Sequence, residues 1–445
     1  MIKLAFADLR DHILVWVGAF AVALACGYVG GWVASLAASA STCESLRDLG
    51  WVVLVFSAIA AMAVIVSVAN LTVAAQRRSY ALWRLASVDP RLVSLVVLVQ
   101  LAVVAVLGAA CGTLIEAATF VPLFPWVFDS PNYRSIDQAA LDVGVSLMPL
   151  VWLAVAGAFL VGGSKGARLA GKTEPIVILR EREAKGRGMT WVRGALFVGV
   201  LVGICRLSAF MAEADPGAVV SSSLYPPILI MTLLAVAAPL VLPALMRAWT
   251  AIVPQRCGGV WQLARRFACY GLAASVSIET PIMVGFGFAA SIFSLSGLLG
   301  IYAQQQDMAD LSTSLDWTSS VLLLGGPVLL CSVGAAAGVV MSSRSRARDV
   351  AVLSVSGVGS AALLAAAAWE AFIHAVNATL LGMLAVLASE AIVANAAGLS
   401  LFDGLAFTEG LVVSAVGFGL VLASTLVPTC IALRRRTFSA FRMRG

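Results

Sequence analysis

Long apolar runs separated by short polar segments follow one another along the whole chain. A helix needs about 20 apolar residues to cross the hydrocarbon core of a bilayer. Runs of this kind occupy residues 13–36, 51–75, 92–117, 143–162, 194–212, 225–246, 271–299, 318–341, 359–383 and 408–432. None of them shows the two-residue alternation of a membrane β-strand. The pattern therefore predicts an all-α integral membrane protein with about ten transmembrane helices.

Composition and charge support this class and suggest an orientation. Of the 445 residues, 61% are hydrophobic and 12% are charged, whereas soluble domains carry about 25% charged residues. A water-soluble globular enzyme is therefore excluded. All but three of the 29 Lys and Arg residues (Arg47, Arg134 and Arg206) fall on one side if the N-terminus is cytoplasmic. The positive-inside rule then predicts that both termini are cytoplasmic, and the net charge of +6 reflects topology rather than binding to nucleic acid.

One motif of soluble ATPases occurs at Gly166–Thr173, which fits the P-loop pattern G-x-x-x-x-G-K-[ST]. A P-loop lies between a strand and a helix, but this octapeptide leaves a predicted membrane helix and continues into Glu174-Pro175. We interpret it as part of a basic tail. The eight cysteines are isolated, without the spacing of a metal site or a disulfide framework. We therefore expect no catalytic residue, metal or cofactor on this chain.

A more informative segment follows the second apolar run, with the sequence QRRSYALWRLASVDPRLV from Gln76 to Val93. Its arginines keep a helix out of the bilayer, whereas Tyr80, Leu82 and Trp83 are poorly suited to full exposure in water. The segment resembles the R-R-x-[EY]-A-L-L-R-A-I-G-A-T-P-R-Q-V segment of FtsX/MacB-like permeases of ABC transporters. In that family it is a cytoplasmic helix that docks on the ATPase subunit. A basic juxtamembrane helix without a partner is the alternative interpretation.

A second copy of this segment begins at Arg348, 270 residues after Arg78. The order of elements is the same around both copies: a span, a basic segment, a span, a loop, a span and a basic tail. The resemblance thus implies two coupling segments, at 77–91 and 344–358. The residues that it assigns to ATPase coupling are Arg78, Tyr80, Ala81, Leu82, Arg84, Arg348, Asp349, Val350 and Val352.

Two four-helix family units and an intervening pair of helices would account for ten spans. This arrangement is similar to that of bacitracin-exporter-type permeases, in which one chain replaces a permease dimer. It implies a first FtsX-like unit over 1–185, a linking pair over 186–250 and a second unit over 251–445. The large extracellular domain of those permeases is missing, because the corresponding loops, 37–50 and 301–316, are short.

The resemblance implies a permease subunit in a bacterial cytoplasmic membrane that exports or extracts an amphipathic peptide or lipid-like compound. Two separate ATPase subunits per chain would bind ATP and Mg²⁺, so the chain itself is not expected to be an enzyme. Its other partner is the lipid bilayer, and no nucleic acid is expected. Two alternatives remain open: an ATP-independent secondary transporter built from two repeats, and an ATPase-driven regulatory transmitter that carries no cargo.

Polar residues inside the apolar runs are the remaining candidates for function. Glu370, His374 and Asn377 share one face of the ninth run, where a charge costs about 2.5–3.5 kcal/mol. We expect them to form a hydrogen-bonded cluster that lines or gates a path. The alternatives are a structural clamp between the two halves and a neutral glutamic acid that shares a proton with His374. Glu279, which closely precedes Pro281, is expected to mark a kink.

Two further segments are expected at the membrane surface. The third connection is aromatic and suits an interfacial belt, formed by Phe120, Phe124, Trp126, Phe128 and Tyr133. Residues 386–401 are too apolar for a solvated loop and predict an interfacial or re-entrant segment.

Overall fold

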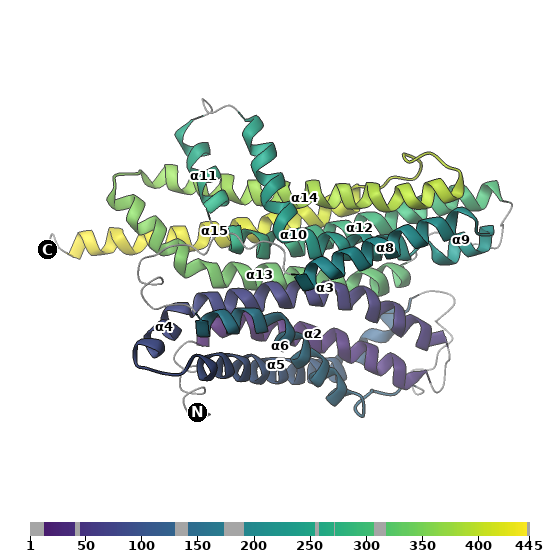
Figure 1. Ribbon diagram of the computed structural model, residues 1–445, viewed down its shortest axis with the longest axis horizontal. Helices are drawn as coiled ribbons and strands as arrows, with labels where there is room; N and C mark the ends of the chain where they lie inside the picture. Colours follow the sequence, from purple (N-terminus) through teal and green to yellow (C-terminus); the bar gives the residue numbers. More distant parts are fainter. Residues whose placement is uncertain are drawn as a thin grey trace.

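The computed structural model describes residues 13–40, 45–129, 141–172, 191–253, 258–270, 272–306 and 317–442. Every regular element in these ranges is an α-helix. Among these residues, ten helices are long and apolar enough to cross a membrane, which agrees with the predicted number of spans and indicates a multi-pass membrane protein. The long helices run in similar directions, with the short helix α4 at one end of the bundle and α9 at the other (Figure 1).

The long helices form two groups of four. The first group consists of α2 (Ile13–Ser39), α3 (Ser45–Ala75), α5 (Pro90–Val127) and α6 (Met148–Lys172), with α4 (Arg77–Leu85) between α3 and α5. The second group consists of α12 (Leu272–Gln305), α13 (Trp317–Val355), α14 (Ser360–Ala397) and α15 (Thr408–Arg442). The connecting helices are α8 (Trp191–Ala212), α9 (Pro216–Ser222), α10 (Tyr225–Ile252) and α11 (Gly259–Tyr270).

Helix packing repeats between the two groups. In the first group α2 packs against α3 and α5, and α5 packs against α6. In the second group α12 packs against α13 and α14, and α14 packs against α15. The groups meet along α3 and α13, and these contacts are also reciprocal, because α2 contacts α13 while α12 contacts α3. The connecting helices α8, α10 and α11 lie mainly on the second group (Figure 1).

The backbone carries the 270-residue spacing that the sequence suggested. Helices α5 and α14 each contain 38 residues and begin 270 residues apart, at Pro90 and Ser360. The turn before each helix is also the same. Ser87 and Gly357 have positive φ angles of 66° and 93°, and Val88 and Val358 each donate a backbone hydrogen bond to the carbonyl five residues earlier. A residue of positive φ with such a hydrogen bond is a common way to end a helix.

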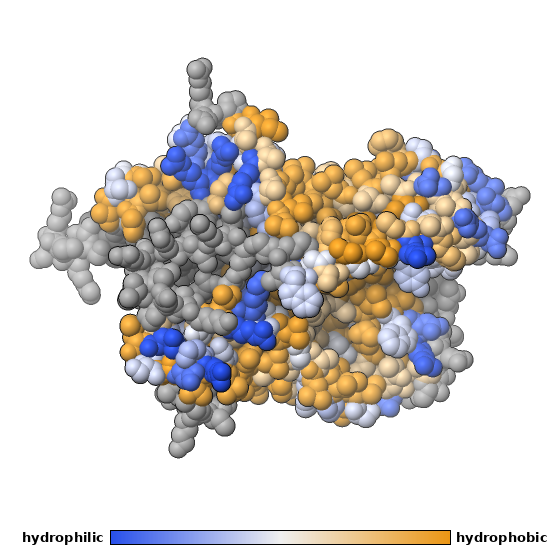
Figure 2. Space-filling view, in the orientation of Figure 1, coloured by the Kyte–Doolittle hydropathy of each residue, from blue (hydrophilic) through white to orange (hydrophobic). Residues whose placement is uncertain are grey.

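Glycines allow the backbones of α2 and α5 to touch. A β-carbon on Gly112 would lie 2.1 Å from the carbonyl oxygen of Leu24, and one on Gly27 would lie 2.3 Å from that of Ala109. Close approach through small residues is a common mode of helix packing in membranes. Between the two polar ends of the bundle, hydrophobic side chains cover most of the visible surface (Figure 2), as lipid contact requires.

The aromatic residues of the third connection are not an interfacial belt. Helix α5 continues to Val127, and Phe120, Phe124 and Phe128 are buried along its inner face. Phe120 meets Trp32 with ring centroids 5.0 Å apart, and Phe124 stacks on Phe128 at 4.2 Å. The four-residue spacing directs these rings toward one side of the helix, so only Trp126 of the described set is well exposed.

Two further expectations about segment ends are corrected. Residues 386–397 continue α14, which ends at Gly398 with a φ of 68°, so the expected interfacial or re-entrant segment is wrong for them. This part of α14 stays helical inside the bundle because Val393 and Ser389 are buried and Ser389 pairs with Ser291 of α12. Tyr133, the last aromatic residue of the expected belt, lies outside the described residues.

Candidate functional site

Helix α4 is the first coupling segment predicted from the sequence. It has nine residues and is set off from α3 by a break at Gln76. Tyr80 is buried and donates a hydrogen bond from its hydroxyl to the side chain of Gln76. By contrast, Leu82 and Leu85 are 55% and 53% exposed. Residues three apart share a helix face, so α4 presents a small apolar surface at its end of the bundle.

The second coupling segment is not a separate helix but the end of α13. Its residues nevertheless show the same sequence of buried and exposed positions as α4. Val350 is buried, whereas Val352 and Val355 are 65% and 72% exposed. These two valines stand 270 residues after the two exposed leucines of α4. Each group of four helices therefore carries an exposed aliphatic pair just before the turn that leads into its third long helix, α5 or α14.

The residues predicted for ATPase coupling thus have different surroundings. Tyr80, Ala81 and Val350 are buried within the chain, which differs from the expectation that they contact a partner directly. Arg84 closes the turn, because its Nη1 donates to the carbonyl of Val88 at 3.1 Å. Leu82 and Val352 are exposed as expected. The described side chains do not include those of Arg78, Arg348 and Asp349, although their backbones are helical.

The P-loop-like octapeptide is helical over residues 166–172, as the last part of α6. A P-loop holds phosphates with an irregular backbone, and this backbone is regular. Its glycines serve helix packing: a β-carbon on Gly171 would lie 2.4 Å from the carbonyl oxygen of Pro90. The described part of the motif is therefore the end of α6 and not the tail after the fourth helix that we expected, because the helix continues to Lys172.

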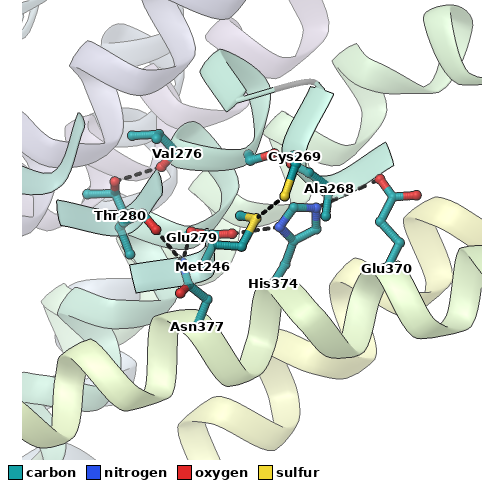
Figure 3. Close-up of polar contacts among 11 residues, drawn as sticks. Met246, Ala268, Cys269, Val276, Glu279, Thr280, Glu370, His374 and Asn377 are labelled. Carbon is teal, nitrogen blue, oxygen red and sulfur yellow. Dashed lines mark hydrogen bonds and ion pairs between the residues drawn. The ribbon is translucent and has the colours of Figure 1, made fainter. Parts of the chain in front are cut away.

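The predicted intramembrane cluster forms around Glu279 of α12 (Figure 3). Its Oε1 lies 2.6 Å from Nδ1 of His374, and its Oε2 accepts a hydrogen bond of 2.7 Å from Nδ2 of Asn377. On the other side of the imidazole, Nε2 of His374 lies 3.8 Å from Oε1 of Glu370. All four side chains are buried. The spacing of the three α14 residues predicted that they would lie together, and this is confirmed.

Glu279 was misjudged from the sequence, since we expected it only to mark a kink. It is the acceptor that holds His374 and Asn377, while Pro281 lies inside the continuing helix α12. Asn377 also donates to the carbonyl of Leu242 in α10 at 3.0 Å. The cluster therefore joins α10, α12 and α14, all on the side of the second group. It is not a clamp between the two groups.

The cluster can hold a proton at two places. The contact between His374 and Glu279 requires one shared proton, and the second ring nitrogen faces another carboxyl group, that of Glu370. Histidine can exchange protons at both ring nitrogens.

Two other buried carboxyl groups were not recognised from the sequence. Oε1 of Glu116 in α5 accepts a hydrogen bond of 2.9 Å from Ser35. Neither carboxylate oxygen of Glu390 in α14 has a hydrogen-bond partner among the described residues. A single acid inside an apolar run was the available signal. Among the residues that the structure describes, no group of three or more His, Cys, Asp or Glu side chains is placed to hold a metal ion.

Comparison with known proteins does not extend this picture. No protein-family model, curated protein or solved structure matches the chain.

Proposed function

We propose that this chain is the permease subunit of an ABC transporter, driven by two separate ATPase subunits. It would lie in a bacterial cytoplasmic membrane, with both termini and the α4 end of the bundle in the cytoplasm. Residues 1–185 and 251–445 would be its two FtsX-like units, joined by 186–250. The observation that carries the proposal is the exposed aliphatic pair that recurs at the same place in both groups of helices.

These pairs are suited to contact with a protein rather than with lipid or water. In α4, Arg84 lies between Leu82 and Leu85, and Arg91 follows in the next helix, so the leucines are close to charges that avoid the bilayer core. Exposure of such aliphatic groups to water is unfavourable. Burial against a partner removes that cost, and two equivalent pairs would suit two copies of the same partner.

The turns provide a route from such a partner to the membrane helices. The side chain of Asp89 accepts a hydrogen bond of 2.7 Å from the backbone N–H of Arg91 at the start of α5, and Arg84 is bonded to Val88. Displacement of α4 would therefore displace α5, which packs on α2. In the second group, the equivalent helix α14 carries the His374 cluster, so the same movement would reach its buried hydrogen bonds. The cargo in this proposal is an amphipathic peptide or lipid-like compound.

The test is purification of the tagged full-length chain from membranes of its own host. An ATPase of the ABC class should co-purify with the wild type. Leu82→Ala/Leu85→Ala and Val352→Ala/Val355→Ala should each weaken retention, because well-packed interface residues contribute about 1–3 kcal/mol. The combination of both pairs should abolish retention. Leu107→Ala/Leu114→Ala is the matched control, because these leucines of α5 are similarly exposed but lie within the span.

Three results would contradict the proposal. If the combined variant still retained the ATPase, the exposed pairs would not be the site that binds it. If Lys172→Ala abolished nucleotide hydrolysis while the variants of the exposed pairs had no effect, ATP would be bound by this chain itself. Cargo movement in vesicles by the chain alone, driven by an ion gradient, would favour a secondary transporter, the alternative that the buried His374 cluster supports.

A further inference from the structure

Helices α3 and α6 are in contact near the α4 end of the bundle and separate toward the α9 end. Near α4, a β-carbon on Gly162 would lie 3.2 Å from Val66, and Nδ2 of Asn70 lies 3.4 Å from the carbonyl oxygen of Gly162. Farther along, α6 runs obliquely away from α3, and α2 is visible between them (Figure 1). Residues of α3 and α6 line the two walls of a groove, and residues of α2 line its floor.

This groove has a volume of about 570 Å³. Its floor and walls are rich in small apolar residues such as Gly30, Ala58 and Ala154, and larger apolar side chains such as Trp51 and Leu150 stand at its exposed rim. The wall on the α6 side, which runs from residue 147 just before the helix to residue 158, is about 16 Å long at about 1.5 Å per residue. That is about half of the ~30 Å hydrocarbon core, the depth that the alkyl chain of one leaflet occupies.

One charged side chain stands among these apolar residues. Arg47, in the first turn of α3, is exposed and lines the groove toward the α9 end. It is the one charged residue among the described residues that form the lining. An arginine at the end of a candidate span, here Leu46–Ala75, and next to an apolar groove is complementary to a molecule with an anionic head and an alkyl chain.

The groove is not a necessary result of the fold, because the described residues of the second group leave only a small cavity at the corresponding place. The corresponding place lies between α12, α13 and α15, where a cavity beside Pro281 and Cys331 has a volume of only about 10 Å³. There α15 packs closely on α12: a β-carbon on Gly417 would lie 3.0 Å from Ile282. In the first group the equivalent space between the helices is left open.

We propose that the groove binds one anionic phospholipid from the leaflet at the α9 end. The alkyl chain lies on α2 between α3 and α6, and the headgroup phosphate pairs with Arg47. This inference does not depend on the proposed ATPase partner, because it rests on the shape and charge of the groove, which the first group forms together with Leu330 of α13.

The test is native mass spectrometry of the full-length chain after reconstitution into vesicles of phosphatidylglycerol and phosphatidylcholine in equal amounts. The wild type should retain one lipid per chain, with a preference for phosphatidylglycerol. Arg47→Glu should reduce that preference about fivefold. Arg206→Glu is the matched control, since Arg206 is an exposed arginine of α8 outside the groove, and it should leave the preference unchanged.

A second pair of variants tests the groove itself. Ala58→Phe/Ala154→Phe places rings at two exposed positions of the lining and should abolish retention of the lipid. Ala118→Phe/Ala195→Phe, at exposed positions outside the lining, should retain it. If the groove-filling variant does not fold, the two arginine variants decide, because both positions are on the surface.

Several results would overturn the proposal. No lipid on the wild type, or equal retention by all four variants, would mean that only general lipid contacts surround the protein. If the wild type retained a lipid without preference for either headgroup, Arg47 would not take part in recognising the lipid. A dimer mass that disappears in the groove-filling variant would assign the groove to contact with a second copy of the chain.

Discussion

Glu279 and Glu390 are both buried acids of the second group, but their surroundings differ. Glu279 is held by His374 and Asn377, whereas the oxygens of Glu390 have no partner among the described residues. Burying an acid without a partner is unfavourable, so Glu390 carries a cost of burial that is not offset by hydrogen bonds among the described residues. At Glu279 the hydrogen bonds offset the cost of burial, and their loss should be measurable.

We therefore predict strong coupling between Glu279 and His374. Glu279→Leu should destabilise the protein by about 3–5 kcal/mol, because it leaves the buried imidazole without its acceptor. His374→Leu added to that variant should cost less than it does alone, with a coupling energy of about 0.5–3 kcal/mol. Reversible unfolding in detergent, followed for both single variants and the double variant, measures this difference.

The control is Glu213→Leu, at an exposed position after α8, which should stay within about 0.5 kcal/mol of the wild type. Additive effects of the two buried substitutions would show that Glu279 and His374 do not stabilise each other.

The sequence was only partly informative about these residues. Regular spacing on one helix was enough to group Glu370, His374 and Asn377. It could not identify their partner, because the face of α12 that meets α14 is decided by packing between helices. Pro281 also directed attention to a kink, although proline is tolerated inside membrane helices.

The space around the glycines differs between tightly packed and loosely packed helices. Small residues spaced four apart, at Gly27/Gly31, Gly108/Gly112, Gly199/Gly203 and Gly334/Gly338, predict close helix packing at four places. It is confirmed at the first two and the last. It is wrong for Gly199/Gly203, where a β-carbon would meet nothing within 4 Å, because α8 lies on the edge of the bundle with most of its surface exposed. Spacing alone does not say whether a neighbouring helix is present.

This contrast predicts opposite effects of the same substitution in two helices. Gly112→Leu should prevent stable folding, because the space for its side chain is occupied by the backbone of α2. Gly199→Leu should be neutral or stabilising by up to about 1 kcal/mol, since leucine favours a helix more than glycine does. Size-exclusion profiles and thermal unfolding of the two variants in detergent provide the measurement. Normal folding of Gly112→Leu would contradict the contact between α2 and α5.

At the scale of the molecule, the two exposed aliphatic pairs predict a stoichiometry. Because one chain carries both pairs, the assembled complex should contain one copy of this chain and two ATPase subunits. Native mass spectrometry of the complex purified from the host measures the ratio directly. A complex with two copies of the chain would mean that one of the pairs is not used.

The number of spans, the two basic segments and their 270-residue spacing were all predictable, because hydrophobicity and charge are local properties of the sequence. The contact of α3 with α13, the position of α10 on the second group and the groove beside α2 were not. Helix faces composed of Ala, Val and Leu are too similar to reveal which of them meet. Differences in side-chain size at a few positions, such as those around Gly30 in the first group and Gly417 in the second, decide whether the space between the helices stays open.

Because one chain contains both helix groups, the protein can evolve differently from a homodimer of one group. In a homodimer each substitution appears at two symmetry-related places, so a groove opened in one half opens in both. Here a substitution in α3 or α6 leaves α13 and α15 untouched. One half is free to acquire a recognition surface while the other keeps the tight packing that stabilises the bundle. Directed evolution of ligand preference should therefore accumulate changes in the first half and few in the second.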